Sequence, residues 1–197
     1  MVDNAAEKVR CDWLNGDPLY TQYHDCEWGV PQYDDQVLFE CLLLEGAQAG
    51  LSWYTILKKR VAYRKAFADF NASRMARFNA QRVERLMNNP GIVRHRGKIE
   101  AFIGNARRYL DMREAGLLWH EYLWTFVDGN PVINHWRHAA QVPAHTTVSL
   151  ALSRDLKQRG FKFVGATICY AFMQSCGLVN DHISSCFRHS EINHGGE

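Results

Sequence analysis

The stretch Arg159-Gly160-Phe161-Lys162-Phe163-Val164-Gly165 decides which fold the sequence predicts. Ser149 can cap a helix before it, and a second helix is expected after it, from about Ala166 to Cys176. Two glycines around a short apolar run allow a tight turn whose backbone N–H groups can hold a phosphate at a helix N-terminus. An ordinary pair of antiparallel helices has the same spacing. A plain helical hairpin and a DNA-binding helix-hairpin-helix element over about residues 149–177 therefore both remain open.

The rest of the chain also predicts helices. Asp34 and Asp35 can cap a helix that reaches Glu45, and Ser52 can cap the next one. Apolar residues follow helical spacing from Ile99 to Leu110. No segment alternates long enough to predict a strand. We expect an all-α protein in which residues 1–197 form a single unit.

Composition limits the class of protein. The 197 residues are 47% hydrophobic and 22% charged, which is typical of a soluble globular protein. Neither a signal peptide nor an apolar run of about 20 residues is present, so we expect a cytoplasmic protein with no membrane partner. Residues 1–57 carry 2 basic and 10 acidic side chains, whereas residues 58–113 carry 15 and 4. This basic block is either a solvated helical surface or a face that contacts phosphates.

The run from Leu43 to Trp53 contains one carboxylate, Glu45, in an otherwise uncharged stretch. An unpaired carboxylate in apolar surroundings is costly or has a shifted pKa, so Glu45 needs a partner. It could lie at the rim of a helix that ends at Gly46, solvated or paired with an arginine. It could also face a pocket, where it would bind a polar or cationic ligand that stacks on Trp53.

Cysteine and histidine spacing suggests a metal site. Six cysteines spread over a domain of this size argue against a disulfide framework. His182 and Cys186 lie about one helical turn apart, and Cys11 with His24 could complete a tetrahedral Cys2His2 set. Accidental sets are also common in a chain with nine histidines, and Cys26 is a possible competing ligand. The spacing alone leaves the metal site open.

From about Cys11 to Cys186 the chain resembles the bacterial DNA-3-methyladenine glycosylase I family. The resemblance rests on long, ordered motifs: Cys11-Asp12-Trp13, Asp17-Pro18-Leu19-Tyr20, Tyr23-His24-Asp25, Glu27-Trp28-Gly29-Val30-Pro31, Leu44-Glu45-Gly46, Gln48-Ala49-Gly50-Leu51-Ser52-Trp53, Arg94-His95-Arg96-Gly97-Lys98-Ile99, Gly104-Asn105-Ala106, Gly160-Phe161-Lys162-Phe163-Val164-Gly165 and Gly177-Leu178-Val179-Asn180-Asp181-His182. It implies an all-α helix-hairpin-helix glycosylase fold. The implied reaction is hydrolysis of the N-glycosidic bond of N3-methyladenine in alkylated double-stranded DNA, which releases 3-methyladenine and leaves an abasic site.

The resemblance also implies roles for individual residues. Glu45 would be catalytic and would bind the flipped base together with Tyr23 and Trp53, with Trp13 and Trp28 as further walls. Simple core packing is the alternative for the last two. The family's structural zinc, one per chain, would bind to Cys11, His24, His182 and Cys186 and join the N- and C-terminal segments.

DNA contacts are expected at two places. Leu51, with Gly50 and Gln48, would fill the gap left by a flipped nucleotide, although Leu51 could instead pack against the following helix. Gly160, Lys162 and Gly165 of the hairpin would contact the DNA backbone. We expect a monomer. The sequence leaves undecided whether 3-methylguanine is also a substrate.

The sequence differs from the wider helix-hairpin-helix superfamily at one point. Most of these enzymes have a catalytic aspartate where this chain has Asn180, and Asp181 is expected to point elsewhere. Lys162 lies inside the hairpin, not at the usual lyase position after it, so we expect a monofunctional hydrolase. The competing function classes are a non-enzymatic DNA-binding protein with a vestigial Glu45 pocket and a glycosidase acting on free nucleosides. The latter would have no use for the basic block.

Overall fold

The computed structural model describes residues 8–194, and most of them are helical. The α-helices are α1 (Pro18–Cys26), α2 (Asp35–Gln48), α3 (Trp53–Ala66), α4 (Ala72–Met75), α5 (Ala80–Met87), α6 (Arg96–Glu114), α7 (Trp119–Trp124), α8 (Thr147–Gln158), α9 (Ala166–Ser175) and α10 (Phe187–His194). Short 3-10 turns are η1 (Ala68–Phe70), η2 (Thr125–Val127) and η3 (Ala139–Gln141). No described helix is both long and apolar enough to cross a membrane.

Helix caps fix where the elements around the site begin. The Asp34 carboxylate accepts a hydrogen bond from the Val37 N–H and starts α2, and Ser52 caps α3, as the sequence predicts. The predicted start of α8 at Ser149 is wrong. Thr146 is the N-cap, and Ser149 lies three residues inside, where the two residues exchange hydrogen bonds as a capping box.

The expectation of no strand is corrected by one small element. Strands β1 (Val132–Ile133) and β2 (Val179–Asn180) pair in parallel with Val132 opposite Val179. The strands are too short to show a period in the sequence. They hold the segment after η2 against the segment after α9.

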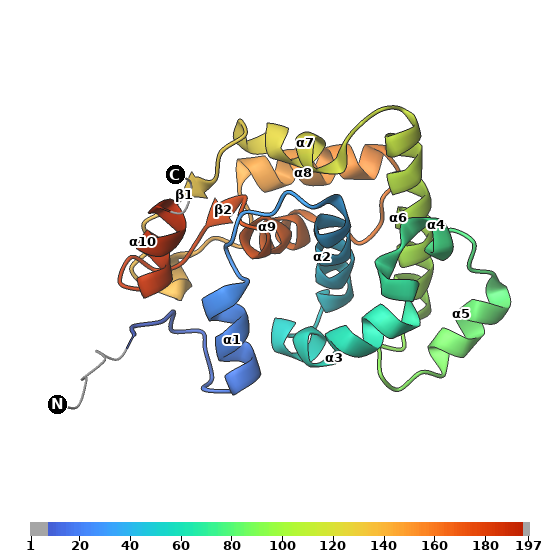
Figure 1. Ribbon diagram of the computed structural model, residues 1–197, viewed down its shortest axis with the longest axis horizontal. Helices are drawn as coiled ribbons and strands as arrows, with labels where there is room; N and C mark the ends of the chain where they lie inside the picture. The colour runs from blue at the N-terminus through green and yellow to red at the C-terminus, as the bar shows by residue number, and fades with distance from the viewer. Residues whose placement is uncertain (1–7, 195–197) are drawn as a thin grey trace.

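Helix α2 occupies the middle of the molecule and packs against α3, α6, α7 and α9 (Figure 1). Because it is surrounded, it is apolar on more than one side, with Leu38, Phe39, Leu42 and Leu43 all buried. Its last turn carries Glu45 into the interior. The position of the central helix therefore determines the surroundings of this carboxylate.

The two ends of the described chain lie together, with α1 close to the C-terminal segment (Figure 1). The Phe187 N–H donates to the Val9 carbonyl at 3.0 Å, and the Gly29 N–H donates to the Gln174 carbonyl at 3.1 Å. At Gly177 the backbone is left-handed, with φ of +71°, and a Cβ there would lie 2.3 Å from the backbone of the segment after α1. Only glycine fits this close approach.

Candidate functional site

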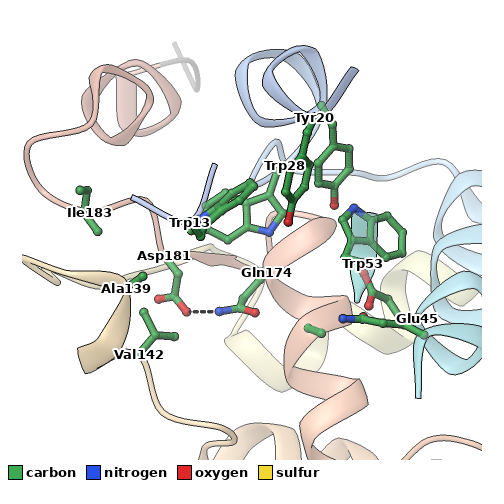
Figure 2. A pocket seen from close by; sticks show the side chains of 13 residues that line it. Trp13, Tyr20, Trp28, Glu45, Trp53, Ala139, Val142, Gln174, Asp181 and Ile183 are labelled. Atoms are coloured by element: carbon green, nitrogen blue, oxygen red, sulfur yellow. Dashed lines mark hydrogen bonds between the residues drawn. The ribbon is translucent and has the colours of Figure 1, made fainter. Parts of the chain in front are cut away.

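A cavity of about 250 Å³ lies between α1, the end of α2, the start of α3 and α9 (Figure 2). This size suits a small heterocyclic ligand. The lining residues are Trp13, Tyr20, Tyr23, Trp28, Glu45, Gln48, Trp53, Ala139, Val142, Ala171, Gln174, Asp181 and Ile183. All five residues expected to bind the base are among them.

Glu45 is buried in the last turn of α2 with only 2% of its surface exposed. Its Oε2 atom has no hydrogen-bond partner within residues 8–194. Burial removes the carboxylate from water and raises its pKa from the ordinary value of 4.5 to about 8. The alternative of a solvated or arginine-paired residue at a helix rim is therefore wrong. Helix α2 continues through Gly46 to Gln48.

Two further polar atoms of the cavity wall are buried without a partner in the described part of the chain. These are the side-chain oxygen of Gln48 and the indole nitrogen of Trp53. Buried polar groups in folded proteins are almost always hydrogen-bonded, so such atoms need an explanation. Together with Glu45 they present two acceptors and one donor to the cavity. This arrangement fits a polar ligand with donors and acceptors on its edge.

Aromatic rings form much of the remaining wall (Figure 2). The Tyr23 ring centre lies 5.4 Å from that of Trp53, and the Trp13 and Trp28 rings are 5.1 Å apart. Burial, and next the nearby Glu45, raise the pKa of the Tyr23 hydroxyl. The sequence reasoning missed Tyr20, which also lines the cavity. Its spacing of three residues from Tyr23 places both rings on one face of α1 and could have revealed it.

Asp181 faces the cavity, contrary to the expectation that it would point elsewhere. It is 2% exposed, and each of its oxygens accepts two hydrogen bonds. The donors are Asn134 and Trp136 to Oδ1, both at 2.7 Å, and Tyr170 at 2.6 Å and Gln174 at 2.7 Å to Oδ2. Asn180 turns the other way and donates to the His189 carbonyl at 3.1 Å. The alternation of side chains along an extended strand separates the two residues.

A second group of candidate functional side chains lies beside this cavity. Cys11, His24, His182 and Cys186 are all buried, and their candidate ligand atoms lie within 4.8 Å of one another. The Cys186 sulfur is 3.5 Å from both His24 Nε2 and His182 Nδ1. Tetrahedral zinc with Zn–S of about 2.3 Å and Zn–N of about 2.0 Å would separate sulfur and nitrogen by roughly 3.5 Å. The predicted ligand set therefore fits zinc geometrically, whereas Cys26 is exposed and outside the set.

The second nitrogen of each imidazole in this cluster is also held. His24 Nδ1 lies 2.7 Å from the Asp25 carboxylate, and His182 Nε2 lies 3.0 Å from the Trp28 carbonyl. Such contacts fix the tautomer and the orientation of a ligating histidine. The hydrogen bond from Cys11 lowers the pKa of the Cys186 thiol, and the same contact together with burial raises the pKa of the Cys11 thiol. The fixed imidazoles suit a metal site, and metal binding would require both thiols to be deprotonated.

The cluster touches the wall of the cavity. The Trp28 and His182 ring centres are 4.5 Å apart, and those of Trp13 and His24 are 5.3 Å apart. Trp13 and Trp28 thus contact the cavity on one side and the Cys/His cluster on the other. Core packing and cavity lining, which were alternatives for these two residues, are both observed.

The two segments expected to contact DNA reach the surface. Leu51 is 42% exposed, and Gly50 before it is left-handed with φ of +77°. In the connection between α8 and α9, Gly160 is left-handed and Lys162 is exposed. Gly165 has ordinary extended geometry and is the N-cap of α9, with no side chain to cap it.

The basic block has two parts. Some of its arginines pair with acidic residues: Arg60 with Glu27, Arg64 with Glu40 and Arg96 with Glu84. Others line a concave surface between the end of α3, α4 and α5 and make no ion pair within residues 8–194: Lys65, Arg74, Arg77, Arg82 and Arg85. This second part has the uncompensated charge that attracts phosphates.

Comparison with known proteins identifies the family. A model of the methyladenine glycosylase family matches residues 13–189. DNA-3-methyladenine glycosylase 1 of Escherichia coli (strain K12) is 53% identical over 177 residues, which are 90% of this chain and 95% of that protein. A crystal structure of a 3-methyladenine DNA glycosylase I superposes with a TM-score of 0.90 at 55% identity, covering 91% of this chain and 98% of that one.

A further solved structure contains a ligand. It is a variant of 3-methyladenine DNA glycosylase I in complex with 3-methyladenine, and it is similar with a TM-score of 0.87 at 41% identity over 90% of this chain and 95% of that one. Identity at this level over nearly the whole length accompanies a common fold. The chain belongs to the methyladenine glycosylase family.

Proposed function

We propose that this protein is a DNA-3-methyladenine glycosylase that starts base-excision repair of alkylated double-stranded DNA. The observation that carries the proposal is the cavity wall, where two unpaired acceptors and one unpaired donor lie beside stacking aromatic rings. A purine edge has the complementary donors and acceptors. Its relatives are named for this activity, which is enzymatic, so a purely DNA-binding role is disfavoured.

The reaction follows from the charge on the damaged base. Methylation at N3 gives adenine a positive charge, so the base leaves readily when water adds to C1′ and the C1′–N9 bond breaks. The bonding electron pair neutralises the departing base. Ionised Glu45 attracts the cationic base in a site shielded from water, where such attraction is strong. Binding of the cation in turn favours ionisation of a carboxyl whose pKa is about 8.

Base flipping would use the exposed loop after α2. Leu51 would fill the space vacated by the nucleotide, and Gln48 and Gly50 would shape the loop around it. Helices α8 and α9 would act as the helix-hairpin-helix element, with Gly160, Lys162 and Gly165 at the phosphates. The reaction would be hydrolysis without a Schiff base, and Lys162 lies in the hairpin, outside the cavity wall. The concave basic surface supports binding to a polyanion.

We also infer one structural zinc ion per chain at the Cys/His cluster. The support is the tetrahedral spacing and the orientation of both imidazoles by Asp25 and the Trp28 carbonyl. Bound there, the ion would supply folding free energy by joining segments more than 150 residues apart, and it would take no part in the hydrolysis. We infer further that the described residues 8–194 fold as one unit and that the protein works as a monomer.

The direct test is incubation of the protein with methylated duplex DNA, followed by identification of the released base. We expect free 3-methyladenine and alkali-labile abasic sites, with no strand cleavage by the protein itself. Binding to methylated duplex without release of any base would instead establish the DNA-binding alternative and overturn the proposal. Light scattering of the purified protein tests whether it is a monomer in solution.

A further inference from the structure

Helix α6 touches both segments that the proposed function brings to DNA. Two polar residues on it, Lys98 and Asn105, are seven positions apart and therefore share one face, about 10 Å apart along the axis. Both are buried, with 7% and 3% of their surfaces exposed. Neither lines the cavity that contains Glu45. Their contacts lie elsewhere.

Lys98 holds the end of α2. Its ammonium group donates to the Ala47 carbonyl at 2.8 Å and to the Ala49 carbonyl at 2.6 Å. Helix α2 has no basic residue in its own last turn, so Lys98 supplies the cation that favours its negative C-terminal end. Burial lowers the pKa of this lysine, a cost that the two short hydrogen bonds offset. The loop carrying Leu51 leaves the helix at the point that Lys98 fixes.

Asn105 holds the connection between α8 and α9. Its side-chain amide donates to the Lys162 carbonyl at 3.0 Å and accepts from the Lys162 N–H at 2.8 Å. The next residue, Phe163, has a left-handed backbone with φ of 57°. The same residue approaches α2 closely, because a Cβ at Gly46 would lie 3.3 Å from the Phe163 carbonyl oxygen. The hairpin is thus held against α6 and α2 together.

We propose that α6 sets the distance between the Leu51 loop and the hairpin, and that Lys98 and Asn105 are positioning residues for the distortion of duplex DNA. The inference rests on the proposed function and assigns roles to two residues outside the base pocket. The Leu51 loop would enter the DNA duplex while the hairpin holds the DNA backbone. A change in the distance between these two segments would therefore impair flipping of the nucleotide. Displacements of about 1 Å far from the reacting atoms can reduce a rate by roughly a hundredfold.

The test separates base binding from base flipping. Lys98→Met and Asn105→Leu, singly and together, remove the polar contacts and keep a side chain of similar length and branching. Met112→Ala is the control, because Met112 is a buried apolar residue of the same helix, seven positions beyond Asn105 and near the C-terminal end of α6. Each protein is assayed for melting temperature, for affinity toward free 3-methyladenine, and for single-turnover excision from a paired lesion and from the same lesion in single-stranded DNA.

We expect both variants to lose about ten- to a hundredfold in excision from the paired lesion. Affinity for the free base should change by less than about twofold, and the loss should shrink when the lesion is already unstacked. Lys98→Arg, which keeps the charge and the donors, should recover part of the rate. Met112→Ala should melt earlier and excise normally at a temperature at which it is folded.

Paired-lesion excision within about twofold of the unmodified protein in both variants would overturn the inference. Equal losses of base affinity and excision would also overturn it, because they would indicate a damaged pocket. If the unmodified protein releases no base, the proposed function fails instead. The two failures are therefore distinguishable.

Discussion

The cavity has two sides that each carry a buried carboxylate, Glu45 beside Trp53 and Asp181 beside Gln174 (Figure 2). Both side chains belong to residues that are 2% exposed. Asp181 accepts four hydrogen bonds from protein donors, whereas Glu45 Oε2 accepts none within residues 8–194. The hydrogen bonds of Asp181 are therefore complete in the protein alone, whereas Glu45 keeps a buried acceptor atom available for a ligand. Both carboxylates are equally buried, so burial does not distinguish their roles. The number of protein hydrogen-bond donors that each carboxylate receives does distinguish them.

The largest expected effect is the loss of stability on removal of the inferred zinc. This site borders the Asp181 side of the cavity, because its ligand His182 directly follows Asp181 in the sequence. Removing the metal with a chelator should lower the free energy of unfolding by several kcal/mol. Base affinity should fall less than stability at temperatures where the protein remains folded. Elemental analysis of protein purified without added metal should give about one zinc per chain. Metal-free protein that melts normally would contradict the inference.

The next effect concerns the Glu45 side. Glu45→Gln keeps the shape of the side chain and removes its attraction for a cationic base, so single-turnover excision should fall about 10²- to 10³-fold. Melting near neutral pH should be unchanged or slightly higher, since the variant no longer buries an ionisable carboxyl. Full excision activity in a normally folded Glu45→Gln variant would contradict the assignment of Glu45 to the base-binding site.

Replacing the carboxylate by an amide on the Asp181 side should reduce stability more than excision, the reverse of the expectation for Glu45→Gln. Asp181→Asn places an amide among four donors and can satisfy only part of them, so the free energy of unfolding should fall by about 2–3 kcal/mol. Denaturant titration measures this loss. Excision per folded molecule should suffer less than in Glu45→Gln. If Asp181→Asn keeps full stability but loses excision, the contrast between the two sides is wrong.

The most gradual effect is a pH dependence. The folded state raises the pKa of Glu45 from 4.5 to about 8, so the folded protein binds a proton that the unfolded chain releases. Stability should therefore decrease as pH rises between these values, by at most about 1.4 kcal/mol per pH unit, and should level off above about pH 8. Urea unfolding across this range should show the decrease in the unmodified protein. The decrease should be reduced in Glu45→Gln.

The sequence predicted the Glu45 side better than the Asp181 side, for a physical reason. Glu45 and Trp53 lie within nine residues of each other near a helix end, so local spacing and an isolated charge were enough to group them. Gln48 was predicted to contact DNA, and its place in the cavity wall was missed. The direction of Asp181 depends on β2, whose partner β1 lies 47 residues earlier. A shift of one position along a strand reverses the side of every side chain, and two-residue strands leave no pattern to read.

Other results also show that contacts between sequence neighbours were predicted and long-range contacts were missed. The Asp34 and Ser52 caps were predicted because the capping residue and the helix it starts are neighbours. Lys98 and Asn105 carried no signal of their own, because each binds backbone about 50 residues away or more. The four metal-ligand candidates were grouped with the help of the family resemblance, which supplies long-range contacts that composition and spacing do not.

The contact between the two ends of the chain has a consequence for biosynthesis. Trp13 and Tyr23 form cavity walls near the start of the sequence, and Asp181 and Ile183 form others near its end. During translation, Trp13 and Tyr23 are synthesised long before Asp181 and Ile183, which line the same cavity. A nascent or prematurely terminated product accordingly has no complete base site. The cavity can therefore become able to recognise a damaged base only after Ile183 has left the ribosome.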